Sequence, residues 1–125
     1  MILDTNALSA VADNEPAAVR LFSQAETIEI PVIVLGEYRF GIAQSRRRSE
    51  YEKWLSELMA ATRILPVDHE TSAQYAEVRT ELKKAGKLIP SNDLWIAALC
   101  RQHRLALMSG DQHFDAVQGL ERIAW

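Results

Sequence analysis

The chain of 125 residues has 48% hydrophobic and 25% charged residues and a formal net charge of −3, a balance typical of a compact folded domain. It has no apolar run near the roughly 20 residues that span a bilayer, and no basic-then-apolar leader, so we expect a cytoplasmic protein with no membrane partner. Cys100 is the only cysteine, which excludes an internal disulfide and suits a reducing compartment.

An acidic chain lacks the broad positive field of many nucleic-acid-binding proteins. A nucleic-acid partner would therefore need a local basic patch or a bound metal ion. Residues 46–48 (three arginines) and Lys83, Lys84 and Lys87 are the candidate patches, although such charge runs are more often solvated surface.

The first third of the chain alternates strand and helix patterns. Residues 1–3 form a short apolar run ending at Asp4, as a buried strand does, and a helical stretch follows over about residues 5–25, broken near residues 14–16. Residues 27–30 alternate and include β-branched side chains, which predicts a second strand. Pro31 then opens a helix, because its fixed φ and missing N–H suit a first helical position.

The alternation continues to the end of the chain. Asp68 is a good N-cap for a helix that ends near Gly86, and Ser91 is predicted to cap the next helix. The expected elements are a helix over residues 49–61, a strand over 63–67, helices to about residues 84 and 103, and strands over 105–109 and 123–125.

Strands that alternate with helices at this spacing predict an α/β fold, a single domain over residues 1–125 with a parallel sheet of about five strands covered by helices on both faces. In such sheets ligands bind at the carboxyl ends of the strands.

Two carboxylates come directly after predicted strands. Asp4 follows the first strand, and Asp111 follows the fourth. Each has a purely structural explanation, since Asp caps helices and is common in turns. Their shared place at strand ends is what makes them candidates for a site.

Two further carboxylates share a face with apolar side chains on predicted helices. Glu37 is spaced with Ile33 and Phe40, and Asp93 with Ile96, Ala97 and Cys100. A carboxylate on an inward face is costly to bury unless a cation or a hydrogen-bond network pairs with it. The structural alternatives are an ion pair with an arginine such as Arg39 for Glu37, and the helix dipole for Asp93.

The combination is more informative than any member. All four acids are expected at the same edge of the sheet, where they would repel one another unless some were protonated or a cation neutralised them. A hard divalent cation with oxygen ligands resolves the conflict, and Mg²⁺ also binds substrate phosphate. The sequence therefore predicts a Mg²⁺ site, with Mn²⁺ as a possible substitute.

Four segments resemble the PIN-domain superfamily, and in particular VapC-type toxins. They are MILDTN (residues 1–6), VLGEYRFG (34–41), IPSNDLWIAA (89–98, the most specific) and SGDQHF (109–114). They occur in family order and cover essentially the whole chain. The resemblance implies a PIN-like three-layer sandwich and a metal-dependent endoribonuclease.

The resemblance also implies roles for individual residues. Asp4, Glu37, Asp93 and Asp111 match the acidic metal-pocket positions, and Asn6 and Ser109 match polar positions that support the pocket. The fourth acidic position is the most variable in the family, and Asp115, one helical turn on, could assist Asp111 or be plain surface.

We expect Asp4 and Asp93 to hold one Mg²⁺, with Glu37 and Asp111 contributing directly or through water. Such an ion lowers the pKa of water and stabilises charge on the scissile phosphate, while Glu37 or Asp111 accepts the proton of the attacking water. By family analogy, cleavage leaves a 5′-phosphate and a 3′-hydroxyl. The resemblance further implies a homodimer, neutralised by a small antitoxin whose C-terminal tail enters the active-site groove.

Other interpretations fit less well. A haloacid-dehalogenase-like phosphatase needs a second Asp where this chain has Asn6, and a phosphate-binding glycine loop is absent. A catalytically silent PIN-like module that binds RNA or protein is the remaining alternative, although all four pocket acids are present. Tyr38 and Trp95 are expected in the core rather than stacked on bases, and His69, His103 and His113 are expected at the surface or as capping residues.

Overall fold

The computed structural model describes all 125 residues and contains one five-stranded parallel sheet. The strand order is β3-β2-β1-β4-β5, and every pair is parallel. The expected α/β fold is confirmed. The strands are β1 (Ile2–Leu3), β2 (Glu29–Pro31), β3 (Arg63–Leu65), β4 (Leu107–Met108) and β5 (Arg122–Ile123).

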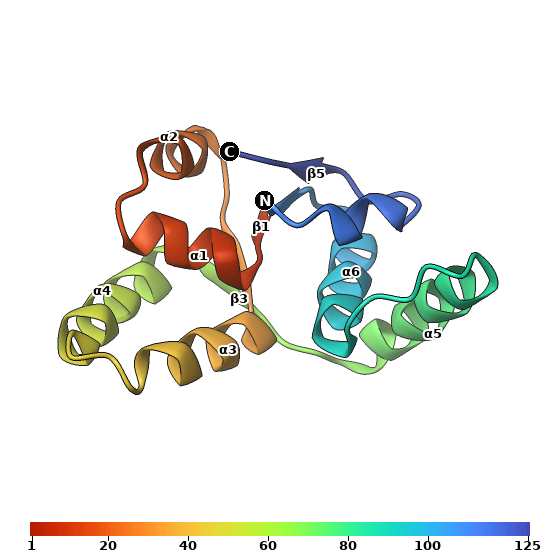
Figure 1. The fold of residues 1–125 in the computed structure, drawn as a ribbon, viewed down its shortest axis with the longest axis horizontal. Helices are drawn as coiled ribbons and strands as arrows, with labels where there is room; N and C mark the ends of the chain where they lie inside the picture. The colour runs from red at the N-terminus through yellow and green to blue at the C-terminus, as the bar shows by residue number, and fades with distance from the viewer.

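Six helices and one 3₁₀ segment surround the sheet. They are α1 (Thr5–Ala12), α2 (Pro16–Gln24), α3 (Val32–Ile42), α4 (Arg48–Ala61), α5 (His69–Lys84), α6 (Ser91–His103) and η1 (Gln112–Ala116). Figure 1 shows α1 to α4 gathered on one side of the central strands and α5 and α6 on the other. None of the helices is both long and apolar enough to cross a bilayer.

The strand order places a topological switch point beside β1. The chain passes from β1 to β2 and β3 on one side of the sheet, and then returns to β4 and β5 on the other side of β1. Ile2 pairs with both Glu29 of β2 and Leu107 of β4, so the carboxyl ends of these strands meet at one edge. Such a reversal leaves a crevice outside the strand ends, where α/β proteins bind ligands.

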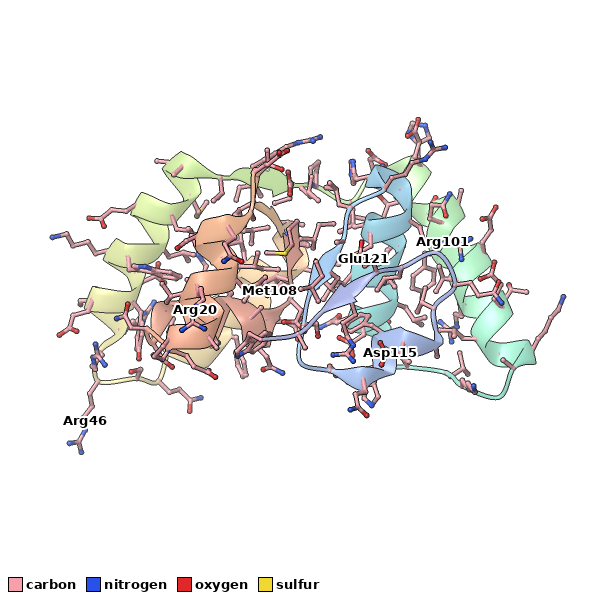
Figure 2. The ribbon with its side chains drawn as sticks, turned by 90° about the horizontal axis from the view of Figure 1, so that it is seen from above. Arg20, Arg46, Arg101, Met108, Asp115 and Glu121 are labelled. Carbon is pink, nitrogen blue, oxygen red and sulfur yellow. The ribbon has the colours of Figure 1, made fainter.

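The core is built from the central strands and the helices that cover them. Ile2, Leu3, Leu107 and Met108 are fully buried, as expected for strands covered on both faces. Phe114 of η1 is also fully buried, and it anchors the segment that follows β4. Figure 2 shows Met108 near the middle of the molecule.

Helix ends follow the sequence signals in two places and depart from them in a third. The expected break in residues 5–25 separates α1 from α2, with Asn14 in a left-handed conformation at φ 56°. Asp68 caps α5 and forms a reciprocal capping box with Thr71. The prediction that Ser91 caps α6 is wrong, because Pro90 occupies the cap position and Ser91 is already the first helical residue.

The inward face expected for α3 is also wrong. The buried residues of this helix are Val34, Leu35, Tyr38 and Ile42, whereas Phe40 is 75% exposed. Residues at 34, 35, 38 and 42 form one stripe at helical spacing, and Glu37 lies at its border rather than within it. Glu37 therefore avoids full desolvation, and it faces a pocket instead of the core.

Candidate active site

A polar pocket of about 550 Å³ lies at the switch point of the sheet. The four acids named from the sequence all line it, although they come from four separate segments of the chain: Asp4 before α1, Glu37 in α3, Asp93 in α6 and Asp111 before η1. No lysine, arginine or histidine is among the lining residues, which also include Thr5, Asn6, Pro90, Ser91, Asn92 and Ile96.

Asp4 forms the floor of the site and is held from two sides. Its side chain caps α1, since one carboxylate oxygen accepts the Ala7 N–H at 2.8 Å, and the other oxygen accepts the Ser109 hydroxyl. The residue is 5% exposed, and burial raises the pKa of its carboxyl group. The hydrogen bonds from Ser109 and Ala7 oppose that shift, while the charges of Asp111 and Glu37 add to it.

Ser109 joins the two strand ends that frame the pocket. It is fully buried after β4, donates its hydroxyl to Asp4, and accepts the backbone N–H of Asp111 at 3.0 Å. The turn that carries Asp111 is therefore tied to the carboxylate that follows β1. Asn6, the other polar residue expected to support the pocket, lines it and is exposed.

Glu37 faces the pocket from α3. Its Oε1 atom accepts the hydroxyl of Thr5, the residue after Asp4, at 2.9 Å. This bond orients the carboxylate of one helix against the first turn of another. It takes the place of the Arg39 ion pair considered from the sequence, because Arg39 instead contacts the sulfur of Met59.

Asp93 lies in the first turn of α6, and its side chain is the only one of the four acids that accepts no hydrogen bond. Its side chain is 21% exposed. Burial raises the pKa of its carboxyl group, and the charges of Asp111, Glu37 and Asp4 raise it further, while His113 lowers it. Repulsion between the acids thus reaches across the pocket, as expected where carboxylates converge without a cation.

His113 is exposed, in agreement with the expectation of a surface residue, and its imidazole also belongs to the same cluster. Its Nδ1 atom lies 3.2 Å from Oδ2 of Asp111 and 3.8 Å from Oδ2 of Asp93. One donor atom from each of these three residues lies within 4.8 Å of the others. The sequence feature that could have indicated this contact is the two-residue spacing of Asp111 and His113 after β4. The other two histidines lie apart from the pocket: His69 is exposed, and the Nε2 atom of His103 is buried without a partner.

Asp115 lies outside the pocket. Both of its oxygens accept hydrogen bonds from Arg122, at 2.8 and 2.9 Å, and Arg122 also donates to the Ser109 backbone carbonyl. The ion pair lowers the pKa of Asp115, chiefly through the hydrogen bond from Arg122. In Figure 2, Asp115 lies on η1. The pair fastens η1 to β5 beside the site.

The aromatic residues considered from the sequence are buried or half-buried, whereas Arg46 of the basic run is exposed. Tyr38 is 3% exposed, in agreement with its expected place in the core, and Trp95 is half-buried and stacks on Tyr75 with ring centroids 4.0 Å apart. Arg46 extends outward from the loop between α3 and α4 (Figure 2), as a solvated residue does.

The donor set of the pocket fits a divalent cation. Four carboxylates, whose charges act on one another, converge where no lysine, arginine or histidine lines the wall. Oxygen donors of this kind suit Mg²⁺ or Mn²⁺, and a bound cation would offset the repulsion that adds to burial in raising the pKa values of Asp4 and Asp93.

Comparison with known proteins places this architecture among nucleases. A family model described as the PIN domain matches residues 1–120. The VapC ribonuclease Y4jK of Sinorhizobium fredii is 32% identical over 98% of this chain and 95% of its own length. Ribonuclease VapC2 of Rickettsia felis is 30% identical over 78% of this chain and 75% of its own length.

Solved structures also match the fold of this chain. The VapBC2 complex of Rickettsia felis, bound to a promoter DNA fragment, contains a chain that matches with a TM-score of 0.86 and 26% identity, over 99% of this chain and 97% of that one. The FitAcB structure from Neisseria gonorrhoeae matches with a TM-score of 0.82 and 29% identity, over 98% of this chain and 95% of that one.

Proposed function

This chain belongs to the PIN domain family, and from that premise we propose that it is a Mg²⁺- or Mn²⁺-dependent endoribonuclease, the toxin of a toxin–antitoxin pair. The observation that carries the proposal is the convergence of Asp4, Glu37, Asp93 and Asp111 in one pocket without a basic residue. A module that only binds RNA or protein gains nothing from clustered acids that repel one another, whereas a metal-dependent nuclease uses their oxygens as ligands for the ion.

The proposed metal ligands are Asp4 and Asp93, with Glu37 and Asp111 contributing directly or through water. When bound, the ion would supply positive charge to the scissile phosphate and lower the pKa of water. It would also let an acidic protein accept RNA, because a bound cation reverses the sign of the local field.

The chain's own residues prepare this chemistry. Ser109 and the Ala7 N–H each donate to one oxygen of Asp4 and so fix the orientation of its carboxylate. Thr5 fixes one oxygen of Glu37 and leaves the other available. Glu37 is the proposed acceptor for the proton of the attacking water, since a carboxylate at the pocket wall and within reach of the reacting centre is suited to general-base work.

The proposed partner is a small antitoxin. The matching chains come from structures of VapBC2, FitAcB and FitAB; the VapBC2 structure is bound to a promoter DNA fragment and the FitAB structure to the IR36 DNA fragment. A homodimer is proposed on the same likeness.

The test is cleavage of total RNA by purified, antitoxin-free protein, with Mg²⁺ or Mn²⁺ and with chelator. Asp93→Asn and Asp4→Asn should each lower cleavage by at least about a hundredfold, and circular dichroism should show the fold retained. Asp115→Asn is the matched control, because it neutralises an acid beside the pocket and should retain cleavage. Metal-independent cleavage, or full activity of Asp93→Asn, would contradict the assignment.

A further inference from the structure

His113 places a nitrogen donor at the rim of the acidic pocket. The imidazole comes from η1, two residues after Asp111, and its side chain is 55% exposed. Its Nδ1 atom faces two carboxylates from different segments, at 3.2 Å for Asp111 and 3.8 Å for Asp93. The longer separation exceeds a hydrogen bond, so the ring is not simply donating to both acids.

These separations match the spacing of ligands around one ion. With metal–ligand bonds of about 2.1 Å, neighbouring donors in an octahedral site lie about 3 Å apart and opposite donors about 4.2 Å apart. The Nδ1 atom of His113 lies 3.2 Å from Oδ2 of Asp111 and 3.8 Å from Oδ2 of Asp93, and both separations fall in this range.

The same three residues have the least committed donor atoms in the pocket. Both oxygens of Asp4 already accept hydrogen bonds, and one oxygen of Glu37 accepts the Thr5 hydroxyl. Asp93 accepts no hydrogen bond, and its altered pKa arises from burial and neighbouring charges alone. Oδ2 of Asp111 accepts no backbone hydrogen bond, because the backbone N–H of His113 donates to Oδ1 instead, at 2.9 Å.

We propose that Nδ1 of His113 is a direct ligand of the divalent ion, together with Asp93 and Asp111, and that this ligand makes the pocket selective for Mn²⁺ over Mg²⁺. The inference rests on the metal site of the proposed function and adds to it a nitrogen ligand and a metal preference. The imidazole binds as the neutral tautomer, with its proton on Nε2 toward solvent.

The preference follows from the chemistry of the donors. Mg²⁺ is a hard ion that prefers oxygen ligands in near-ideal octahedral geometry and retains several waters. Mn²⁺ accepts carboxylate oxygen equally well, and as a transition metal it gains more from an imidazole nitrogen. One His beside two Asp therefore shifts the balance toward Mn²⁺ without excluding Mg²⁺.

The test measures the bound ion directly and needs no RNA. Mn²⁺ is titrated into metal-free wild type, His113→Gln and His69→Gln, and binding is followed by loss of the free-ion signal in electron paramagnetic resonance. Pulsed measurements on the bound ion then report coupling to a nearby ¹⁴N nucleus. Mg²⁺ affinity is obtained by competition against Mn²⁺. His69→Gln is the matched control, since His69 is exposed at the start of α5.

We expect ¹⁴N coupling in wild type and His69→Gln and none in His113→Gln. Mn²⁺ affinity should fall at least about tenfold in His113→Gln, as for loss of groups that hold a metal ligand in place, while Mg²⁺ affinity changes much less. Glutamine keeps the approximate size and polarity of the side chain, so folding should be unaffected; a thermal melt checks this.

Two negative outcomes separate the two proposals. Tight Mn²⁺ binding by wild type without ¹⁴N coupling would overturn the role of His113 and leave the carboxylate site intact. Absence of Mn²⁺ and Mg²⁺ binding by folded wild type would overturn the metal-dependent nuclease itself. An equal loss of Mn²⁺ and Mg²⁺ affinity in His113→Gln would contradict the selectivity.

Discussion

The buried carboxylates of the pocket differ in how far the fold compensates their charge. Asp93 lies partly buried beside three other acids and accepts no hydrogen bond that would offset its charge. Asp4 is nearly fully buried but is compensated by Ser109 and the end of α1. The two aspartates therefore differ: Asp4 supports the fold as well as the site, whereas Asp93 contributes little to the fold.

Neutralising Asp93 should consequently stabilise the metal-free protein. Asp93→Asn removes repulsion from Asp111 and Glu37 without removing a hydrogen bond, so we expect the free energy of unfolding to rise by about 1 kcal/mol, a gain typical of relieved strain at functional sites. Urea denaturation with chelator present is the measurement. A loss of stability of similar size would mean that the Asp93 carboxylate holds α6 in place.

The pH dependence of stability should show the same repulsion. The pKa values of Asp4 and Asp93 are raised above 3.8 in the folded protein. Between pH 3.8 and these raised values, the folded protein therefore binds more protons than the unfolded chain. Stability of the metal-free protein should therefore increase as pH falls from neutral toward the raised pKa values.

Asp68 and Asp115 act in the opposite direction at lower pH. Their pKa values are lowered below 3.8 by hydrogen bonds, so their stabilisation is lost as pH falls through that range. Thermal melts from pH 7 to pH 3 in chelator should pass through a maximum. The rise on the neutral side should shrink in Asp93→Asn, and an unchanged profile in that variant would count against the coupled acids.

The starts of two helical segments position two of the carboxylates in the pocket. Asp4 caps α1 and Asp111 precedes η1, so the local signal for a helix start also puts a carboxylate at a strand end. The helix α5 is fixed differently: Asp68 and Thr71 form a capping box, and both also bond to Gln102 of α6. This contact ties the start of α5 to the helix that carries Asp93.

Removing the Thr71 hydroxyl should weaken both elements. Thr71→Val keeps the branched shape but leaves the Asp68 N–H and the Oε1 atom of Gln102 without a partner, and Thr71 is fully buried. We expect a loss of about 1–2 kcal/mol in the free energy of unfolding. Thr80→Val, at an exposed position of the same helix, is the control by denaturant titration, and it should stay within about 0.5 kcal/mol of wild type.

For the whole molecule, the decisive contact joins residues 105 positions apart. Ser109 donates to Asp4 and thereby fixes the ends of β1 and β4 across the switch point of the sheet. Arg122 adds a second tie, from β5 to the Ser109 carbonyl and to Asp115. The site is therefore a property of the assembled sheet rather than of any one motif.

Loss of this contact should affect stability and metal binding together. Ser109→Ala leaves one oxygen of buried Asp4 without its donor, and we expect a loss of about 1–2 kcal/mol in unfolding free energy. Metal affinity should fall about tenfold, as for other groups that orient ligands. Ser56→Ala, at an exposed position of α4, is the control. Wild-type metal affinity in Ser109→Ala, measured by calorimetry, would show that Asp4 needs no such orientation.

The order of strands and helices follows from the sequence alone, because apolar periodicity, Pro31, Asp68 and the break near Asn14 are local signals. The gathering of the four acids could also be predicted. Asp4 and Asp111 follow strands at the carboxyl edge of a parallel sheet, and Glu37 and Asp93 lie on the helices that begin at that edge.

Other features depended on the tertiary structure. The rotation of α3, which exposes Phe40 and puts Glu37 at the pocket wall, is set by packing against neighbouring helices that local periodicity does not specify. The pairing of Asp115 with Arg122, and the approach of His113 to Asp93, depend on where η1 lies after β4. Sequence determined which charged groups share the edge of the sheet; only the folded chain decided which of them face one another, because side-chain partners are chosen by contacts between distant segments.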